Sequence, residues 1–183
     1  MNEQRLIQQA QQEVANNITG SFSQLVMLYQ ARLHQYLLAR CHSRHDADDV
    51  LQETFISAYK YLGSYNSQWQ FSTWLFTIAN RLIKKQNNMY NQNDELSAID
   101  QSSELGLIAI KQNNIWIQIK KVLAADAYDV LWFFYIEELS LKEIAQILQR
   151  SQSWVKISLF RSKKKLASSE NIKQLSEDFL MQG

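Results

Sequence analysis

Aromatic rings and cations are crowded together between residues 68 and 85. Four rings fall within eight residues and three cations within five: Trp69, Phe71, Trp74 and Phe76, then Arg81, Lys84 and Lys85. Trp69 lies among glutamine and serine in a polar segment, where an indole could stack on an unpaired nucleobase for about 1 to 3 kcal/mol. Cations beside such a ring suit the phosphates of the same strand. Phe71 and Trp74 are expected in the core, because they share the apolar stripe of a predicted helix.

Acidic side chains gather just before that segment. Asp46, Asp48, Asp49 and Glu53 fall within eight residues. Asp49 and Glu53 are four residues apart on a predicted helix, so they repel each other mildly. A basic partner would explain this face, and a plain solvated surface is the alternative.

A third set of residues has the spacing of a helix-turn-helix between Leu141 and Leu159. The inward residues are Ile144, Ala145 and Leu148, then Val155 and Leu159, with a break at 149–151. Six cations lie in a span without an acid: Arg150, Lys156, Arg161, Lys163, Lys164 and Lys165. Such a helix suits the major groove, with early residues at base edges and cations on phosphate. If four cations contact phosphate, affinity falls with roughly the fourth power of salt concentration. A helical hairpin with a solvated charged face is the simpler alternative.

These residues need helices to position them, and the sequence predicts an all-α fold. The chain has no proline and four glycines, and its apolar residues recur at spacings of three and four. We expect helices at 22–41, from Asp46 to about residue 62, from Ser72, and near 113–124, 127–137, 141–149 and 152–167. Asp46 and Asp126 are expected at helix starts, and Ser140 with Glu143 forms a predicted capping box.

The face of the helix that starts at Ser72 is also predicted. Its inward residues are expected to be Phe71, Trp74, Leu75, Ile78, Ala79 and Leu82. Its outward residues are expected to be Thr73, Thr77, Asn80, Arg81 and Lys84.

The helices are expected to form two small domains joined by a flexible linker. The expected divisions are a polar segment at 1–20, a first domain at 21–87, a linker at 88–112, a second domain at 113–168 and a tail at 169–183. The linker is rich in asparagine, glutamine and serine. The first 18 residues and those past Ser168 are expected to fray.

Composition favours a cytoplasmic protein. Of 183 residues 46% are hydrophobic, yet apolar runs stop well short of the roughly 20 residues that cross a bilayer, so stable membrane insertion is not expected. The first residues lack the features of a signal peptide. A single cysteine, Cys41, agrees with a reducing compartment.

The sequence offers little for catalysis or cofactor binding. Cys41, His42 and His45 cluster, but a closed zinc site needs four ligands. His34 has no nucleophile partner in the sequence, and no glycine-rich phosphate loop is present. We therefore expect no cofactor, no metal and no enzymatic activity.

Three stretches together resemble a known family. HDADDVLQETFISAY, FSTWLFTIANRL and LSLKEIAQILQRSQSWVKISLFRSKKKL are similar to bacterial sigma factors of the extracytoplasmic-function group. The resemblance covers residues 22–86 and 113–167. It implies a subunit that binds core RNA polymerase, directs it to promoters and helps to melt them.

The resemblance also implies partners and sites. Asp46, Asp49, Gln52 and Glu53 would bind the clamp helices of the largest polymerase subunit. The flap of the second-largest subunit is a further expected partner. Promoter DNA at the minus-ten element, duplex and melted, would meet Trp69, Phe71, Ser72, Thr73, Asn80, Arg81, Lys84 and Lys85. The minus-thirty-five element would meet Gln152, Ser153, Trp154, Lys156, Ser158, Arg161 and Lys164. The linker would lie in the polymerase channel, and an anti-sigma factor is an expected partner.

The chain departs from the family pattern at several positions. Leu123-Ala124 replaces Leu-Pro, and Gln149 replaces the turn glycine, where a left-handed residue costs roughly 1 kcal/mol more. Ile157, Ser158 and Phe160 stand where polar or basic residues are usual. The aspartate and arginine usual after the third helix are missing around 83–87. Two alternatives stay open: a helix-turn-helix regulator that acts without polymerase, and a polymerase-binding adaptor that does not read DNA.

Overall fold

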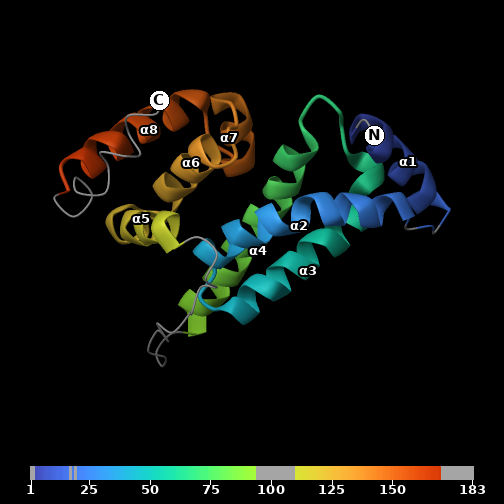
Figure 1. Ribbon diagram of the computed structural model, residues 1–183, viewed down its shortest axis with the longest axis horizontal. Coiled ribbons are helices and arrows are strands. Elements are labelled where there is room, and N and C mark those ends of the chain that lie inside the picture. Colours follow the sequence, from blue (N-terminus) through green and yellow to red (C-terminus); the bar gives the residue numbers. More distant parts are fainter. Residues whose placement is uncertain (1–2, 17, 19, 94–109, 170–183) are drawn as a thin grey trace. The chain divides into compact units, whose positions relative to one another are not determined.

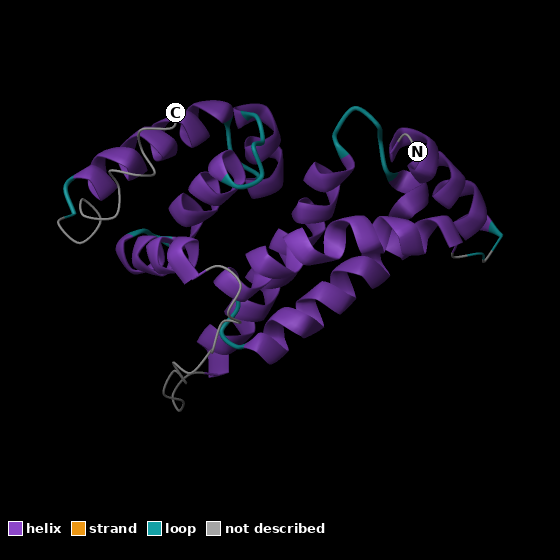
Figure 2. Ribbon diagram, in the orientation of Figure 1, coloured by secondary structure: helices purple, strands orange, loops and turns teal. Residues whose placement is uncertain are grey.

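The computed structural model describes residues 3–16, 18, 20–93 and 110–169. This part of the chain is helical and contains no strand (Figure 1, Figure 2), which confirms the all-α prediction. The helices are α1 Glu3–Ala15, α2 Gly20–Arg40, α3 Arg44–Tyr61, a 3-10 turn Leu62–Ser64, α4 Phe71–Asn93, α5 Ile110–Val122, α6 Ala125–Tyr135, α7 Leu141–Leu148 and α8 Gln152–Ala167. The chain divides into two compact units, 1–103 and 104–183.

The core of the first unit lies between α2, α3 and α4. The ring centroids of Phe22 and Tyr59 are 5.2 Å apart, and His34 Nε2 lies 2.7 Å from Asp48 Oδ1. These two contacts join the start of α2 to the end of α3 and the end of α2 to the start of α3. The two helices therefore pack antiparallel.

Helix α1 corrects the expectation that the first 18 residues fray. Leu6, Ile7 and Ala10 are buried, and α1 packs on α2. Glu13 accepts hydrogen bonds from the backbone N–H of Ser21 at 2.6 Å and from its hydroxyl at 2.7 Å, and these bonds lower the Glu13 pKa. The apolar stripe of α1 is short and lies among glutamines, so composition alone suggests a polar segment.

Helix α3 begins at Arg44, two residues before the expected start. Ser43 is the N-cap residue, and it forms a capping box with Asp46. Ser43 Oγ accepts from the Asp46 N–H at 3.1 Å, and Asp46 Oδ2 accepts from the Ser43 N–H at 3.1 Å. Asp46 therefore closes the first turn from within the helix.

Helix α4 confirms the predicted face only in part: Phe71, Leu75 and Ala79 are buried as expected, whereas other residues of the helix are not where they were predicted. Thr73, Thr77 and Asn80 were expected outward, yet they are 0%, 7% and 2% exposed. Trp74, Ile78 and Leu82 were expected inward and are only half-buried: the core positions are taken by Phe71, Leu75, Phe76, Ala79 and Ile83. The helix packs against both α2 and α3. A threonine suits such a site because its hydroxyl bonds its own helix, as Thr77 Oγ1 does to the Thr73 carbonyl at 2.7 Å.

The second unit contains the predicted helix-turn-helix. Helices α7 and α8 are joined by residues 149–151, and Ile144, Ala145, Leu148, Val155 and Leu159 are buried as expected. The Ser140–Glu143 capping box is present, with Ser140 Oγ accepting from the Glu143 N–H at 3.3 Å. Helix α6, in contrast, has Ala124 as its N-cap, and Asp126 lies in its first turn rather than before it.

The elements also bear on the expected ends of the linker. Helix α4 continues to Asn93 and α5 begins at Ile110, so 88–93 and 110–112 are helical. Residues 94–109 and 170–183, which hold the rest of the linker and most of the tail, lie outside the described residues, as do 1, 2, 17 and 19.

Candidate nucleic-acid interface

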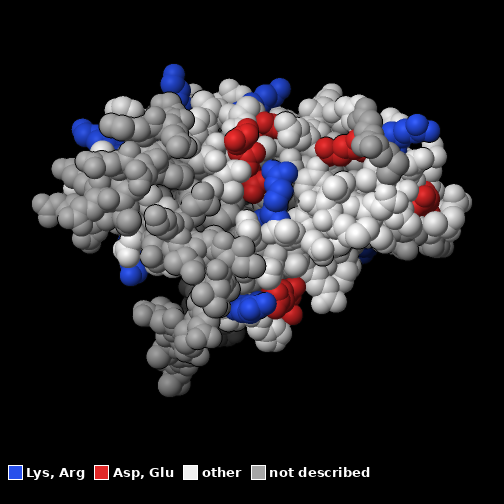
Figure 3. All heavy atoms as spheres, viewed as in Figure 1, with Lys and Arg blue, Asp and Glu red and all other residues white. Residues whose placement is uncertain are grey.

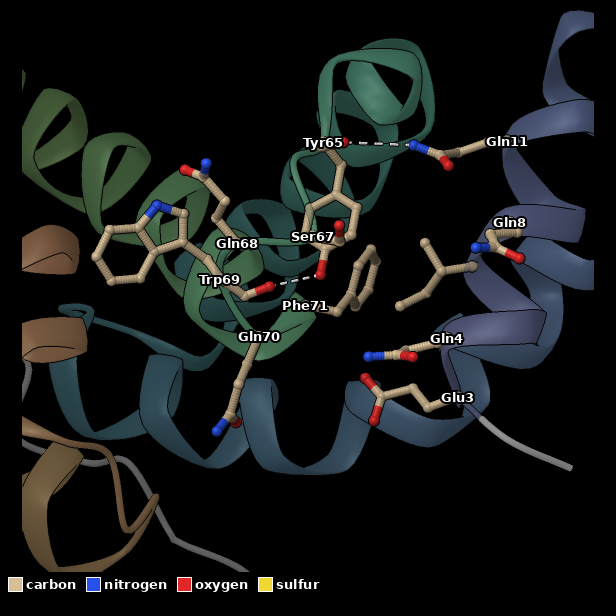
Figure 4. A pocket seen from close by; sticks show the side chains of 11 residues that line it. Glu3, Gln4, Gln8, Gln11, Tyr65, Ser67, Gln68, Trp69, Gln70 and Phe71 are labelled. Atoms are coloured by element: carbon tan, nitrogen blue, oxygen red, sulfur yellow. Dashed lines mark hydrogen bonds between the residues drawn. The ribbon is translucent and has the colours of Figure 1, made fainter.

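The segment before α4 forms one wall of a hollow on the first unit (Figure 4). Its volume is about 440 Å³, within the range of small-ligand sites. Residues of α1 line one side and the segment lines the other: Glu3, Gln4, Ile7, Gln8 and Gln11 face Tyr65, Ser67, Gln68, Trp69, Gln70 and Phe71. Amides of glutamine offer both donors and acceptors, as a base edge requires. The predicted aromatic segment thus borders a site with space for a flat polar group.

Tyr65 holds this segment in place. Its hydroxyl donates to the Trp69 carbonyl at 2.6 Å, and its own carbonyl accepts from Gln11 Nε2 at 3.5 Å (Figure 4). Gln11 Nε2 also lies 3.0 Å from the Leu62 carbonyl. The Tyr65 ring packs against Phe71 and Trp74, each at 5.4 Å between centroids, and burial raises the pKa of its hydroxyl. The tyrosine therefore stays a neutral donor well above neutral pH.

Helix α1 is fixed at its other end by Glu3. The Tyr29 hydroxyl donates to Glu3 Oε1, and burial, together with this carboxylate, raises the Tyr29 pKa. Tyr29 packs on Phe71 at 5.3 Å between centroids. The contacts of Glu3 and Gln11 thus join α1 to both the core and the Trp69 segment.

The predicted minus-ten residues separate into two groups. Trp69 and Lys84 are half-buried, and Arg81 and Lys85 are exposed. The other four residues, Phe71, Ser72, Thr73 and Asn80, are buried inside the unit. In Figure 4 the Trp69 indole points away from α1, with its ring clear of the packed Phe71. Trp69 and three cations are therefore at least partly accessible, and the other four residues are not.

The predicted acidic face lies on α3, and its members differ in what they contact. Asp46 accepts from Ser43 and, through Oδ1, from Gln86 Nε2 at 3.0 Å. Asp49 Oδ2 lies 3.4 Å from His45 Nδ1. Gln52 and Glu53 are exposed, and Glu53 accepts from the Ser57 hydroxyl at 3.5 Å. Asp46 thus has a structural role, and Asp49, Gln52 and Glu53 form the accessible face.

Two exposed apolar residues on α2 and α3 were not identified from the sequence. Met27 on α2 and Ile56 on α3 are 64% and 51% exposed. Both lie between the Phe22–Tyr59 and His34–Asp48 contacts that pair the two helices. The apolar pattern of the sequence assigned Met27 and Ile56 neither to the core nor to a site. Their exposure depends on which side of each helix is packed, and the pattern does not show that.

On α8 most of the predicted minus-thirty-five residues are accessible. Gln152, Ser153, Lys156, Arg161 and Lys164 are exposed, whereas Trp154 and Ser158 are half-buried. The Arg150 guanidinium lies 5.0 Å from the Trp154 ring and bonds Asp126 at 2.9 Å. Ile157 and Phe160, noted above as departures from the family pattern, are exposed on the same helix.

Three of the six cations around α8 make contacts within the unit. Besides Arg150, Lys163 lies 5.2 Å from the Tyr135 ring, and Lys165 Nζ donates to the Val122 carbonyl at 2.7 Å. Lys156, Arg161 and Lys164 are exposed along the helix.

Three further features concern surface charge, membrane-spanning helices and metal ligands. Figure 3 shows one face, on which charged side chains stand in several separate groups with uncharged surface between them. No helix in the described ranges is long and apolar enough to span a bilayer. Among the same residues, no three His, Cys, Asp or Glu side chains are grouped to hold a metal, and Cys41 is buried.

Comparisons with known proteins give matches in both units. Residues 25–87 match the family model Sigma-70 region 2, and residues 121–166 match Sigma-70, region 4. The chain is 28% identical over 178 residues to the ECF RNA polymerase sigma factor SigW of Bacillus subtilis, covering 88% of this chain and 95% of SigW. It is 30% identical to the RNA polymerase sigma factor YlaC of the same species, covering 80% of this chain and 90% of YlaC.

Two solved structures share the fold. CnrH in complex with the cytosolic domain of CnrY has a TM-score of 0.65 at 21% identity, covering 89% of this chain and 96% of that chain. The sigma factor RpoE of Bartonella quintana, in complex with the anti-sigma factor NepR, has a TM-score of 0.61 at 19% identity, covering 80% and 94%.

Proposed function

The chain belongs to the extracytoplasmic-function group of the sigma-70 family, and from this premise we propose how its surfaces divide the work of starting transcription. It is a sigma factor that binds core RNA polymerase and directs it to specific promoters. A regulator that acts without polymerase is not favoured, because both sigma regions are matched in one chain. It acts in the cytoplasm and makes or breaks no covalent bond itself.

The exposed face of α3 binds the core enzyme. Asp49, Gln52 and Glu53 offer acceptors to the clamp helices of the largest subunit, and the exposed Ile56, three residues after Glu53 on α3, offers apolar area. Apolar residues among charges are typical of protein interfaces. Asp46 contributes indirectly, by capping the helix that carries the face.

The segment that carries Trp69 binds an unpaired base of the melted minus-ten element. The indole stacks on an unpaired base, and Arg81, Lys84 and Lys85 contact the backbone. The observation that carries this proposal is the Trp69 segment itself: it borders a hollow of about 440 Å³ and is held by Tyr65 and Gln11. Such a site is preorganised, so little ordering cost remains when the base enters.

Helix α8 lies in the major groove of the minus-thirty-five element. Gln152 and Ser153 stand at its exposed start, where base edges are read, and Lys156, Arg161 and Lys164 meet phosphates. A proteinaceous inhibitor is a further proposed partner, by analogy with RpoE and its anti-sigma factor NepR. The flap of the second-largest polymerase subunit is proposed to hold the second unit.

The test is run-off transcription with core polymerase, with and without this protein, on a library of promoter fragments. We expect Trp69→Ala to reduce promoter opening more than closed-complex binding, because the stacked base exists only after melting. Opening is measured by permanganate reactivity of unpaired thymines, and binding by mobility shift. Tyr61→Ala, which removes another exposed ring of the first unit, is the matched control. Equal losses of binding and opening with Trp69→Ala would contradict the base-trapping role.

A further inference from the structure

The centre of the exposed face of α8 is apolar. Ile157 is 50% exposed and Phe160 is 68% exposed. Ser153, Ile157, Phe160 and Lys164 are spaced by four, three and four residues, so they share one stripe of the helix. Arg161 follows Ile157 by four residues and is exposed beside them. An apolar pair thus stands in the middle of the surface that the proposed function brings to DNA.

The charges around the pair favour nucleic acid over a protein as the partner. Lys156, Arg161 and Lys164 surround it, and no acidic residue occurs between residues 144 and 169. Cations on both sides match the two phosphate backbones that border a groove. An isolated exposed apolar residue needs no explanation, but two neighbours on one stripe of a groove-binding helix do.

The major groove presents one apolar group among its base edges, the C5-methyl group of thymine. Isoleucine and phenylalanine can bury that methyl group, whereas opposite guanine or cytosine they would cover donors and acceptors without bonding them. Neighbours three residues apart on a helix are separated by about 5 to 6 Å, and base pairs by about 3.4 Å. Two methyl groups one or two base-pair steps apart would therefore match the pair.

We propose that Ile157 and Phe160 determine specificity by contacting thymine methyl groups one or two steps apart in the minus-thirty-five element. The inference rests on the proposed placement of α8 in the major groove. In this proposal Ile157 and Phe160, which are atypical of the family, recognise thymine, while Gln152 and Ser153 recognise polar base edges.

The test uses the complete chain bound to core polymerase. Its preferred minus-thirty-five sequence is first selected from promoter duplexes randomised in that region. Each thymine of the selected element is then replaced singly by deoxyuridine, which lacks only the methyl group, and the dissociation constant of each duplex is measured. We expect about a fourfold loss of affinity at each of two positions, the value for one buried methyl group, and none at other thymines.

Alanine variants assign the two methyl groups to side chains. Ile157→Ala should abolish the thymine-to-deoxyuridine difference at one position, and Phe160→Ala at the other. Both residues are exposed, so neither change should unfold the unit. Ile117→Ala removes an exposed isoleucine from α5 and should keep both differences.

Several results would overturn the inference. They are equal affinities for thymine and deoxyuridine at every position, differences that persist in both alanine variants, or a selected element without two such thymines. Loss of core binding in the variants, with the differences retained, would also overturn it and assign the pair to a protein partner. A chain that forms no complex with core, or selects no sequence, would instead count against the proposed function.

Discussion

The backbone conformation of Gln149 costs conformational free energy at the turn of the helix-turn-helix. Gln149 ends α7 with φ 56° and ψ 47°, in the left-handed region, and its N–H bonds back to the helix. For residues other than glycine this conformation costs roughly 1 to 2 kcal/mol. The sequence predicted this position and its cost, because the family has glycine at the turn.

We expect Gln149→Gly to stabilise the second unit by up to about 1 kcal/mol. The relief of left-handed strain exceeds the entropy that glycine adds to the unfolded chain. The change in unfolding free energy is measured by urea unfolding, with hydrogen exchange of the α7 and α8 amides as the readout for the second unit. Gln146→Gly, in the helix interior, is the control and should destabilise by about 1 kcal/mol. Equal effects of the two changes would contradict the strain argument.

Acidic residues on α3 are expected to divide between stability and binding. Asp46→Ala should lower the unfolding free energy of the first unit by about 1 kcal/mol, since it removes half of a capping box. Glu53→Ala, at an exposed position, should change stability by less than about 0.5 kcal/mol and weaken core polymerase binding. Thermal unfolding and titration with labelled core measure the two effects. Stronger loss of core binding from Asp46→Ala than from Glu53→Ala, at temperatures where both fold, would reverse the assignment.

Single residues were the least predictable part of the site. Thr73 and Asn80 looked like the polar side of a helix, yet both are buried. Sequence periodicity assigns polar residues to the exposed side of a helix. It therefore misses buried residues whose hydroxyl groups bond their own helix, and it misses helices that are packed on two sides. Trp69 was identified correctly as lying outside the helix, because the glutamine and serine around it break the apolar pattern.

At the scale of elements, α1 is the part that connects the hydrophobic core to the Trp69 segment. Gln11 bonds the carbonyls of Leu62 and Tyr65, at the two ends of the turn that precedes Trp69. The sequence did not predict this helix, because three buried apolar residues among glutamines give a weak signal. Its contact with α2 and the Glu13–Ser21 bonds are tertiary features, which no local pattern contains.

Gln11→Ala is expected to reduce promoter opening about fivefold without weakening core binding. The change removes hydrogen bonds worth roughly 0.5 to 1.5 kcal/mol each to the segment that positions Trp69. Opening is followed by 2-aminopurine fluorescence at the melted position. Gln12→Ala, on the exposed side of the same helix, should leave opening unchanged. Equal opening by the two variants would show that α1 does not position the segment.

At the scale of the whole molecule, function depends on several weak surfaces acting together on one long partner. The net charge is only +1, so general attraction to nucleic acid is small and local patches must supply it. The all-α class, the helix-turn-helix and the family were all predictable, because they depend on repeated patterns spread over many residues. The packing of each unit was not, since it depends on pairwise fits between helices.

Salt dependence separates cations that meet phosphate from those engaged within the protein. We expect Lys164→Ala to reduce the slope of log affinity against log salt by about 1 for the holoenzyme on promoter duplex. Lys165→Ala should reduce it less, because Lys165 Nζ already donates to the Val122 carbonyl. Binding measured between roughly 50 and 200 mM salt gives the slopes. Equal reductions for the two lysines would contradict this division.

The pairing of Arg150 with Trp154 gives the protein a built-in optical probe. The guanidinium lies 5.0 Å from the indole at the start of α8 and is tethered to Asp126. Indole emission responds to a charge at that distance, so whatever displaces Arg150 alters the light that Trp154 emits. Docking of this helix on duplex DNA can therefore be followed in real time on the unlabelled chain, once the other four tryptophans, Trp69, Trp74, Trp116 and Trp132, are replaced by phenylalanine.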